Sequence, residues 1–286
     1  MSGPAEPAMT VAPDGVRLAT YEWGNPAGPE LVLVHGFAQC HLCFAPQIHS
    51  ELARDFRIVA YDLRGHGGSD KPVEPAAYQG REVWARDLAA VLKAKRLKRP
   101  VLAGWSMGGR IIRQYLMNYG DAAIAGINFV GSLVLEYPES RGPGASLRPQ
   151  TPSSRPSASS LAEQLDAAIA FIDACYEIKP DERQFRVALA YNMLVTAPVR
   201  QAIGGWSTDP DETLVALKQV RVPVLVTHGR KDMVVLPTAA EKTAAAISGA
   251  RLSWYEDCGH SPFQENASRF NRELAAFARE AVRSRV

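Results

Sequence analysis

Short apolar runs that end in glycine or a turn alternate along this chain with segments of helical period. Six runs can be distinguished, at residues 31–34, 57–61, 101–103, 124–130, 222–226 and 251–255. Runs that are apolar at nearly every position suit strands buried on both faces, as in parallel sheets. Between two of the runs, Trp84, Leu88 and Val91 repeat at helical spacing. This alternation predicts right-handed crossovers and a three-layer α/β sandwich with a mostly parallel central sheet.

A chain of 286 residues is near the upper limit for one hydrophobic core, so one large domain with an inserted subdomain is expected. Residues 136–160 are rich in Pro, Ser, Gly and Arg and have no apolar period, which indicates a loop. Helical spacing resumes at Leu161. We therefore expect a core formed by residues 14–132 and 207–286, a mostly helical lid at 133–206, and a loose arm at 1–13. Helices that pack on the flank of the sheet, without a role at the site, are the alternative for the lid.

Composition and charge exclude several classes of protein. Apolar residues make up 47% and charged residues 22%, as in folded globular chains. A formal charge of +2 gives no basis for a nucleic-acid-binding face. No apolar run reaches the length of a membrane span, and the N-terminus shows no basic segment followed by an apolar one, so a cytoplasmic location is expected. The four cysteines are too few for a disulfide scaffold.

The strongest motif is Gly104-Trp105-Ser106-Met107-Gly108, a G-x-S-x-G pattern between an apolar run and an amphipathic segment. A tight strand-to-helix turn places the serine in a strained backbone conformation with its hydroxyl exposed, and the glycines give room for that turn. The N-terminus of the following helix offers unpaired N–H groups to an oxyanion. The motif therefore predicts Ser106 as a nucleophile.

A serine hydroxyl needs a base, and the base needs a group that orients it. Of the six histidines, His260 follows the last apolar run, and loops after parallel strands meet at the edge where Ser106 is expected. For the other five, turn, packing or surface positions are favoured: His35, His41, His49, His66 and His228. Asp232 follows the run at 222–226 and is the expected partner of His260. Asp62, also at the end of a run, is its rival.

A C-x-x-C pattern and several aromatic residues are further candidates for a role at the site. Cys40-His41-Leu42-Cys43 is a C-x-x-C pattern, which in other contexts indicates zinc or a redox pair. No second C-x-x-C exists, so two small thiols on a helix are expected, and no metal or cofactor is predicted. Aromatic residues near the site or the lid are candidates to line an apolar substrate pocket: Trp105, Trp206 and Phe263, with Phe37 beside them.

These motifs together resemble those of α/β-hydrolase fold enzymes of the esterase, non-haem haloperoxidase and C–C-bond hydrolase kind. The matching elements lie in the expected order between residues 31 and 270: His35-Gly36-Phe37, Asp62-Leu63-Arg64-Gly65-His66-Gly67-Gly68-Ser69, Gly104-Trp105-Ser106-Met107-Gly108-Gly109, Gly229-Arg230-Lys231-Asp232 and Gly259-His260. The resemblance implies a catalytic triad of Ser106, His260 and Asp232. It also implies an oxyanion hole formed by the backbone N–H groups of Phe37 and Met107.

The resemblance further implies a reaction class. Relatives that open epoxides or displace halide carry aspartate at position 106, so serine there favours acyl transfer. The expected activity is a cofactor-independent serine hydrolase that acts on a small ester or related carbonyl compound. C–C-bond hydrolysis of a ring-cleavage product, peroxide chemistry of the haloperoxidase type, and a non-catalytic ligand-binding member remain alternatives. The expected partner is a small-molecule substrate rather than a nucleic acid or a membrane, and a homo-oligomer stays open.

Overall fold

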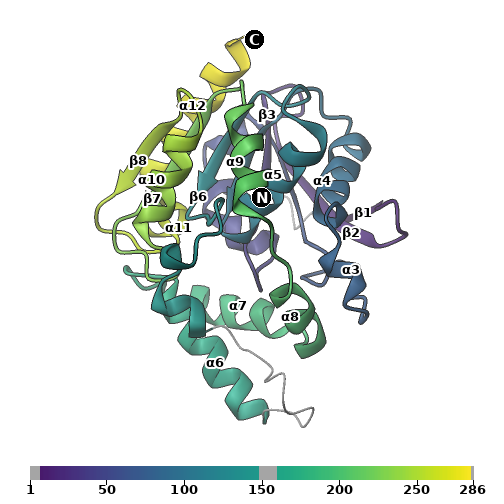
Figure 1. The fold of residues 1–286 in the computed structure, drawn as a ribbon, viewed down its shortest axis with the longest axis vertical. Coiled ribbons are helices and arrows are strands. Elements are labelled where there is room, and N and C mark those ends of the chain that lie inside the picture. The colour runs from purple at the N-terminus through teal and green to yellow at the C-terminus, as the bar shows by residue number, and fades with distance from the viewer. Residues whose placement is uncertain (1–6, 148–159, 285–286) are drawn as a thin grey trace.

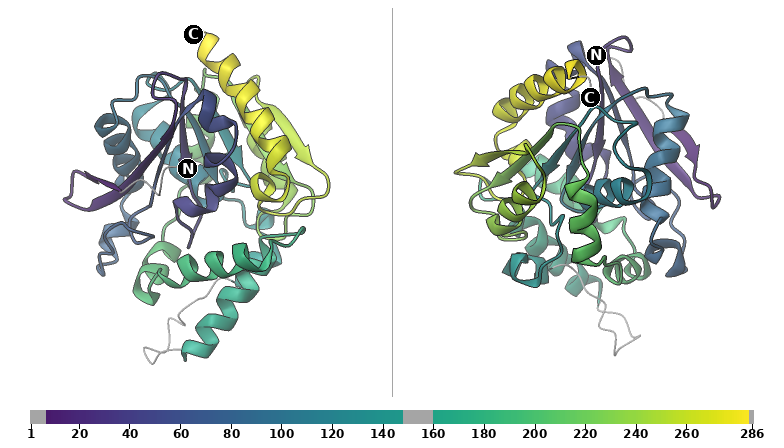
Figure 2. Two further views of the ribbon diagram at one scale, coloured as in Figure 1. Left: turned by 180° about the vertical axis from the view of Figure 1, so that it is seen from behind. Right: turned by 45° about the horizontal axis from the view of Figure 1, so that its top comes forward.

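The computed structural model describes residues 7–147 and 160–284. An eight-stranded sheet lies between two layers of helices, as Figures 1 and 2 show from three directions. The strands follow the order β1-β2-β4-β3-β5-β6-β7-β8. Their bounds are β1 (Ala8–Val11), β2 (Arg17–Gly24), β3 (Glu30–Val34), β4 (Arg57–Tyr61), β5 (Val101–Trp105), β6 (Gly126–Val130), β7 (Val224–Gly229) and β8 (Arg251–Tyr255). The fold is therefore the predicted three-layer α/β sandwich.

The six predicted runs correspond to β3 through β8, and every neighbouring pair among them is parallel. β2 pairs antiparallel with β4, and β1 pairs antiparallel with β2. The prediction of a loose arm is wrong for Ala8–Val11, which form β1, with Ala8 opposite Thr20. β1 lies at the edge of the sheet and only one of its four residues is buried, so it lacks the apolar run that marks the inner strands. Residues 1–6 of the arm lie outside the described part.

Helices cover both faces of the sheet. One face carries α4 (Val83–Ala94), α5 (Met107–Tyr119), α9 (Pro210–Lys218) and α10 (Pro237–Ala246) (Figure 1). The other carries α1 (Ala45–Ile48), α2 (Leu52–Asp55), α11 (Pro262–Glu265) and α12 (Ala267–Arg283) (Figure 2, left). Short helices connect these elements: η1 (His41–Phe44), α3 (Ala76–Gln79), η2 (Pro138–Ser140) and η3 (Pro143–Leu147).

Three further helices gather at one end of the molecule, beyond the end of the sheet (Figure 1). They are α6 (Leu161–Ala174), α7 (Glu182–Met193) and α8 (Ala197–Gly204). The chain after α6 contacts α11, which follows the loop after β8, since the backbone N–H groups of Glu177 and Ile178 each donate to Glu265 at 2.9 Å. The inserted segment therefore contacts the carboxyl edge of the sheet. Residues 148–159 of the predicted loop lie outside the described part.

The close approach of α5 to the sheet depends on Gly108. A Cβ placed on Gly108 would overlap the backbone carbonyl oxygen of Val34 at the end of β3, and a backbone atom cannot move aside as a side chain can. We expect Gly108→Ala to lower the free energy of unfolding by about 1–3 kcal/mol, the usual cost of overpacking. Urea or thermal unfolding measures the effect.

Gly204 is the matched control, because a Cβ placed on it meets no described atom within 4 Å. At the end of α8, Gly204→Ala removes backbone freedom from the unfolded chain and should stabilise the protein by about 0.4–1 kcal/mol. Equal unfolding midpoints for Gly108→Ala and the natural protein would contradict the packing account.

Candidate active site

Ser106 occupies the sharp turn between β5 and α5. Its backbone has φ 53° and ψ −116°, so a non-glycine residue is held in a strained conformation, as the motif predicts. Its N–H donates to the carbonyl of Val130 on β6 at 2.8 Å. A Cβ on Gly104 would lie 2.7 Å from the backbone of Gly108, so a side chain at position 104 would prevent this turn. The glycines therefore allow the strain at Ser106.

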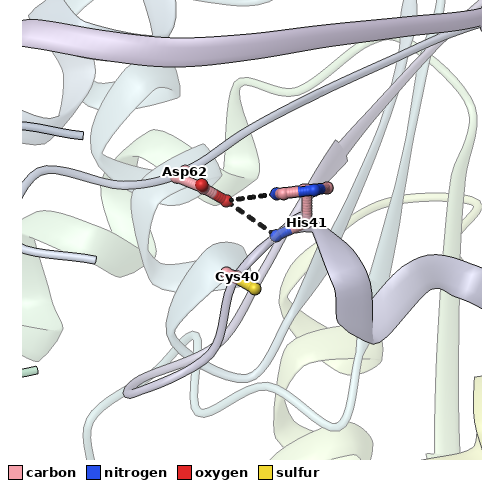
Figure 3. A group of neighbouring side chains, drawn as sticks. All are labelled: Cys40, His41 and Asp62. Atoms are coloured by element: carbon pink, nitrogen blue, oxygen red, sulfur yellow. Dashed lines mark hydrogen bonds and ion pairs between the residues drawn. The ribbon is translucent and has the colours of Figure 1, made fainter. Parts of the chain in front are cut away.

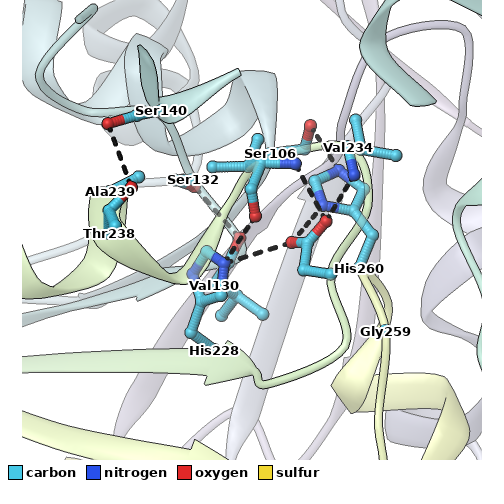
Figure 4. A network of polar contacts seen from close by, with 12 residues as sticks. Ser106, Val130, Ser132, Ser140, His228, Val234, Thr238, Ala239, Gly259 and His260 are labelled. Atoms are coloured by element: carbon cyan, nitrogen blue, oxygen red, sulfur yellow. Dashed lines mark hydrogen bonds and ion pairs between the residues drawn. The ribbon is translucent and has the colours of Figure 1, made fainter. Parts of the chain in front are cut away.

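His260 lies between Ser106 and Asp232 and contacts both. Figure 4 labels His260 and Ser106. Its Nε2 is 2.9 Å from Oγ of Ser106, and its Nδ1 is 2.7 Å from Oδ2 of Asp232. All three residues are buried, with exposed fractions of 6% or less. They follow β5, β8 and β7, whose carboxyl ends lie at one edge of the parallel sheet. The structure thus brings the three predicted residues together in hydrogen-bond contact.

The other carboxylate oxygen of Asp232 is held by the backbone. Oδ1 accepts the N–H groups of Val234 and Val235 at 2.8 and 2.9 Å, which fixes the carboxylate plane and leaves Oδ2 for His260. Burial by itself raises the pKa of Asp232. The charge of His260 and hydrogen bonds from His260 and His228 outweigh burial and hold that pKa well below its usual range. Asp232 is therefore a buried, ionised acceptor.

His228, for which a turn, packing or surface position was predicted, also contacts Asp232. Figure 4 labels His228. Its Nε2 is 2.8 Å from the carbonyl oxygen of Val235 and 3.2 Å from Oδ2 of Asp232. The N–H at Nε2 of His228 is thus shared between the Val235 carbonyl and Oδ2 of Asp232, and it helps to orient the Asp232 carboxylate at Oδ2. The available signal was its place at the end of the run at 222–226, four residues before Asp232.

The loop after β3 lies directly against the nucleophile. A Cβ on Gly36 would be 3.1 Å from Cβ of Ser106, so the Gly36–Phe37 backbone passes beside the serine. Met107 is the first residue of α5, and N–H groups in a first helical turn have no partner within the helix. The backbones of both predicted oxyanion residues therefore adjoin Ser106.

Two buried histidines hold the loop that carries Phe37. Nε2 of His35 accepts the N–H of Leu63 at 3.0 Å, and Nε2 of His66 accepts the N–H of Ala38 at 3.1 Å. Both rings are therefore neutral acceptors at Nε2 in the folded protein. Burial lowers the pKa of His35 to about 4 and that of His66 to about 3.

These two histidines should make stability depend on pH. Between about pH 6.5 and pH 4 the unfolded chain binds protons that the buried rings of His35 and His66 do not, so the free energy of unfolding falls as the pH falls. Each ring contributes up to about 1.4 kcal/mol per pH unit. Urea unfolding at pH 7.5, 6.5, 5.5 and 4.5 measures the slope. His66→Gln should reduce this slope. The difference in unfolding free energy between the variant and the natural protein at pH 8 gives the cost of the lost packing by itself. An unchanged slope would contradict this account.

The rival acid, Asp62, is engaged elsewhere (Figure 3). Its Oδ1 accepts the backbone N–H of His41 at 2.7 Å and contacts Nδ1 of that histidine at 3.0 Å, while Oδ2 accepts from Gly68 and Tyr21. Asp62, His41 and Cys40 present ligand atoms within 4.8 Å of one another. Both oxygens of the Asp62 carboxylate already accept hydrogen bonds from these donors. Burial raises the pKa of the Cys40 thiol, which disfavours the thiolate that binds a metal. The cluster therefore resembles an anchor for the loop more than a metal site.

A small cavity opens at Ser106. It has room for about 10 Å³ of water-sized volume, close to the minimum for a single water, and Arg110 and Arg141 are among its lining residues. A larger hollow of about 520 Å³ lies between residues 50–56 and α12 and contains none of the site residues. The small cavity, rather than the large hollow, is therefore the space next to the predicted nucleophile.

Three predicted substrate contacts, Trp105, Trp206 and Phe263, are almost fully buried. Nε1 of Trp105 donates to the carbonyl of His260 at 2.8 Å, and its ring packs on Phe263 with centroids 4.8 Å apart. The ring of Trp206 packs 4.3 Å from the guanidinium of Arg110. None of the three is among the described residues that line the small cavity. The structure gives them packing contacts, and substrate contact by them stays a prediction.

The strand order and the strained serine after β5 are those of an α/β hydrolase. The chain belongs to the α/β hydrolase fold family, whose sequence profile matches residues 29–267. It is a hydrolase of that family, as the resemblance among its motifs implied.

Solved structures and curated relatives agree with this assignment. The chain is 32% identical to a protein from Burkholderia cenocepacia assigned as an aryl esterase, with a TM-score of 0.88 over 97% of this chain and 100% of that one. It is 31% identical to the esterase RhEst1 from Rhodococcus sp. ECU1013, with a TM-score of 0.82 over 96% and 98%. It is 27% identical over 283 residues to a non-heme chloroperoxidase from Streptomyces lividans, covering 93% of this chain and 97% of the relative. No helix in the described residues has the length and apolar character needed to cross a membrane.

Proposed function

We propose that this hydrolase is a cofactor-independent serine esterase that cleaves a small carboxylic ester through an acyl-enzyme on Ser106. The observation that carries the proposal is the continuous contact from Oγ of Ser106 through the ring of His260 to Asp232, at 2.9 and 2.7 Å. A serine becomes nucleophilic when a base accepts its proton and a third group orients that base.

The geometry supports a two-step reaction. Oγ of Ser106 attacks the ester carbonyl while Nε2 of His260 takes the hydroxyl proton. That proton then passes to the leaving alcohol, and the C–O bond to the alcohol breaks. Nε2 of His260 then takes a proton from a water that attacks the acyl carbon. The bond from that carbon to Oγ of Ser106 breaks, the acid leaves, and the proton returns to Oγ. Asp232 holds the proton on Nδ1 and stabilises the imidazolium that forms in each step.

The oxyanion of the tetrahedral intermediate requires two donors beside the serine. We assign them to the backbone N–H groups of Phe37 and Met107, because the Gly36–Phe37 backbone and the start of α5 both adjoin Ser106. The N-terminal end of α5 also carries partial positive charge. Each such donor typically lowers the barrier by roughly 2.7–4 kcal/mol.

The similar structures favour an ester over other substrates. Both solved relatives named above, at 32% and 31% identity, are esterases by description. Peroxide in place of water would form a peracid from the same acyl-enzyme, and similarity to a non-heme chloroperoxidase supports testing it. C–C-bond hydrolysis of a ring-cleavage product could use the same three side chains.

We assign the inserted helices α6–α8 to a lid over a small-molecule substrate. The support is their position at one end of the molecule, where the chain after α6 donates hydrogen bonds to Glu265 on α11, the helix that follows the loop with His260. The segment at 133–206 would then control access to the site.

The test combines labelling with a substrate panel. The protein is treated with a fluorescent organophosphonate, and the labelled residue is identified by mass spectrometry. p-Nitrophenyl esters of increasing acyl length are assayed with and without peroxide, beside a vinylogous diketone. Stoichiometric label on Ser106 with ester turnover supports the proposal. Label elsewhere, or turnover of the diketone alone, overturns it.

A further inference from the structure

The cavity at Ser106 has an unusual wall. Two arginines, Arg110 and Arg141, line it together with Ser106 and Met107. The rest of the wall is apolar: Leu133, Ala145, Val234 and Val235. An apolar pocket with a few placed polar groups is how proteins orient a ligand, and here the charged groups at the cavity are both cationic.

The two arginines that line the cavity share one carboxylate with a third arginine, Arg113. Glu136 accepts from Nη2 of Arg110 at 2.9 Å, from Nη1 of Arg113 at 2.8 Å and from Nη2 of Arg141 at 3.3 Å. Among the described residues, no second carboxylate pairs with any of the three. Three positive charges against one negative charge leave the cluster with a formal excess of two.

Such an excess is unfavourable where the groups are buried. Arg110 is 8% exposed and Arg113 is fully buried, and burial lowers the pKa of Arg113 to about 10. An uncompensated charge in a low-dielectric interior is unfavourable, and an anion that pairs with it removes part of that cost. The cavity is therefore a place where a negative charge on a ligand would be stabilised.

Two of the arginines retain donors for such a ligand. Nη1 of Arg110 makes no hydrogen bond to a described residue, whereas its Nε and Nη2 are held by Glu136 and the carbonyl of Trp206. The side chain of Arg141 is 44% exposed, and its one ion pair, with Glu136, is the longest of the three. Arg141, which already lines the cavity, can therefore leave Glu136 to bind a ligand while Glu136 keeps its pairs with Arg110 and Arg113.

We propose that the natural substrate is a short ester that also carries a free carboxylate, which Arg141 and Arg110 bind beside Ser106. The inference rests on the proposed esterase function and names its substrate class. Because Ser106, Arg110 and Arg141 line the same small cavity, only a few atoms can separate the ester from the carboxylate. The arginines could bind a carboxylate on the acyl side of the ester or one on the alcohol side, and both arrangements use the same ion pair.

The test compares charged esters with neutral esters of the same shape. Monoethyl succinate is paired with ethyl 4-methylpentanoate, and carboxymethyl acetate with isobutyl acetate, in a pH-stat assay. A charge-assisted hydrogen bond corresponds to about 10- to 100-fold in affinity. We expect kcat/KM for at least one charged ester to exceed that of its neutral partner by about 10-fold or more. The pair that shows the preference identifies the side of the ester that carries the carboxylate.

Variants assign the preference to the arginine. Arg141→Gln should lower kcat/KM for the charged ester about 10-fold or more, mainly through KM, and leave the neutral ester within about 2-fold. Arg141→Lys should retain part of the preference. Arg86→Gln, on the exposed side of α4 and outside the proposed lid, is the matched control and should leave both esters unchanged. With the natural protein alone, succinate should inhibit hydrolysis of the neutral ester competitively, and 4-methylpentanamide, which has no carboxylate, should do so at least about 10-fold more weakly.

Three outcomes overturn the inference. Equal kcat/KM within both pairs removes the preference, and equal losses on both members of a pair in Arg141→Gln remove the arginine from it. An enzyme that cleaves only neutral esters also rejects the carboxylate site while keeping the proposed function. Absence of turnover on all four esters together with no phosphonate label on Ser106 overturns the proposed function itself.

Discussion

Replacing Ser106 by alanine should reduce ester turnover by roughly 10⁵- to 10⁶-fold, a loss of about 7–8 kcal/mol in transition-state stabilisation. The hydroxyl is the atom that forms the acyl-enzyme in the proposed reaction, and no other described serine contacts the ring of His260. The turnover that remains in the variant comes from the oxyanion donors and from substrate binding. Steady-state kinetics on a p-nitrophenyl ester, with the organophosphonate label as a second readout, measure the effect.

The matching control is the stability of the variant. Ser106→Ala removes one hydroxyl and keeps Cβ, so its unfolding midpoint should stay close to that of the natural protein or rise, because the strained backbone is retained and the buried hydroxyl is gone. Turnover within 10-fold of the natural protein, or undiminished labelling, would place the nucleophile at another residue.

The second large effect is expected for Asp232→Asn, with kcat lowered about 10⁴-fold. Two backbone N–H groups, from Val234 and Val235, bind Oδ1, so the amide oxygen of asparagine must take that position. Its NH₂ group then faces Nδ1 of His260 and forces the ring into the tautomer with a proton on Nε2. A protonated Nε2 cannot accept the proton of Ser106.

Asp62→Asn is the informative comparison, because Asp62 is the other buried carboxylate that follows a strand and contacts a histidine, His41. It should lower stability and have a much smaller effect on kcat in the folded fraction than Asp232→Asn. If Asp62→Asn gave the larger loss of kcat while remaining folded, the assignment of the acid would be wrong. Activity and urea unfolding are measured on the same preparations.

Much of the site follows from local patterns. Ser106 was predicted from glycine spacing between a strand and a helix, and the strained backbone at φ 53° confirms the reason for that spacing. Asp232 and His260 were predicted because each follows an apolar run. The structure places the three in contact, at 2.9 and 2.7 Å. Position at the end of a strand is enough to predict such meetings in a parallel sheet, because those ends share one edge.

The predictions that failed or gained no support concern strand pairing at the sheet edge and the packing of single side chains. β1 is an edge strand defined by its pairing with β2, so its four residues carry no pattern of their own. Trp206 was assigned to a substrate pocket from its place near the end of the insertion, yet its ring packs on Arg110. Burial and pairing of this kind depend on neighbours that sequence order does not identify.

The amino-acid sequence by itself determined the layered α/β fold and the serine, histidine and aspartate at its strand ends. Periodicity, glycine spacing and the alternation of strands and helices along the chain are local or nearly local properties. Only the tertiary structure decided what surrounds them. The sharing of Glu136 by three arginines arises where α5 packs beside the chain that follows β6, and the contact between His228 and Asp232 depends on how the turn after β7 folds. Charge and hydrogen bonding in a buried site depend on distances of a few ångströms, and folding alone sets those distances.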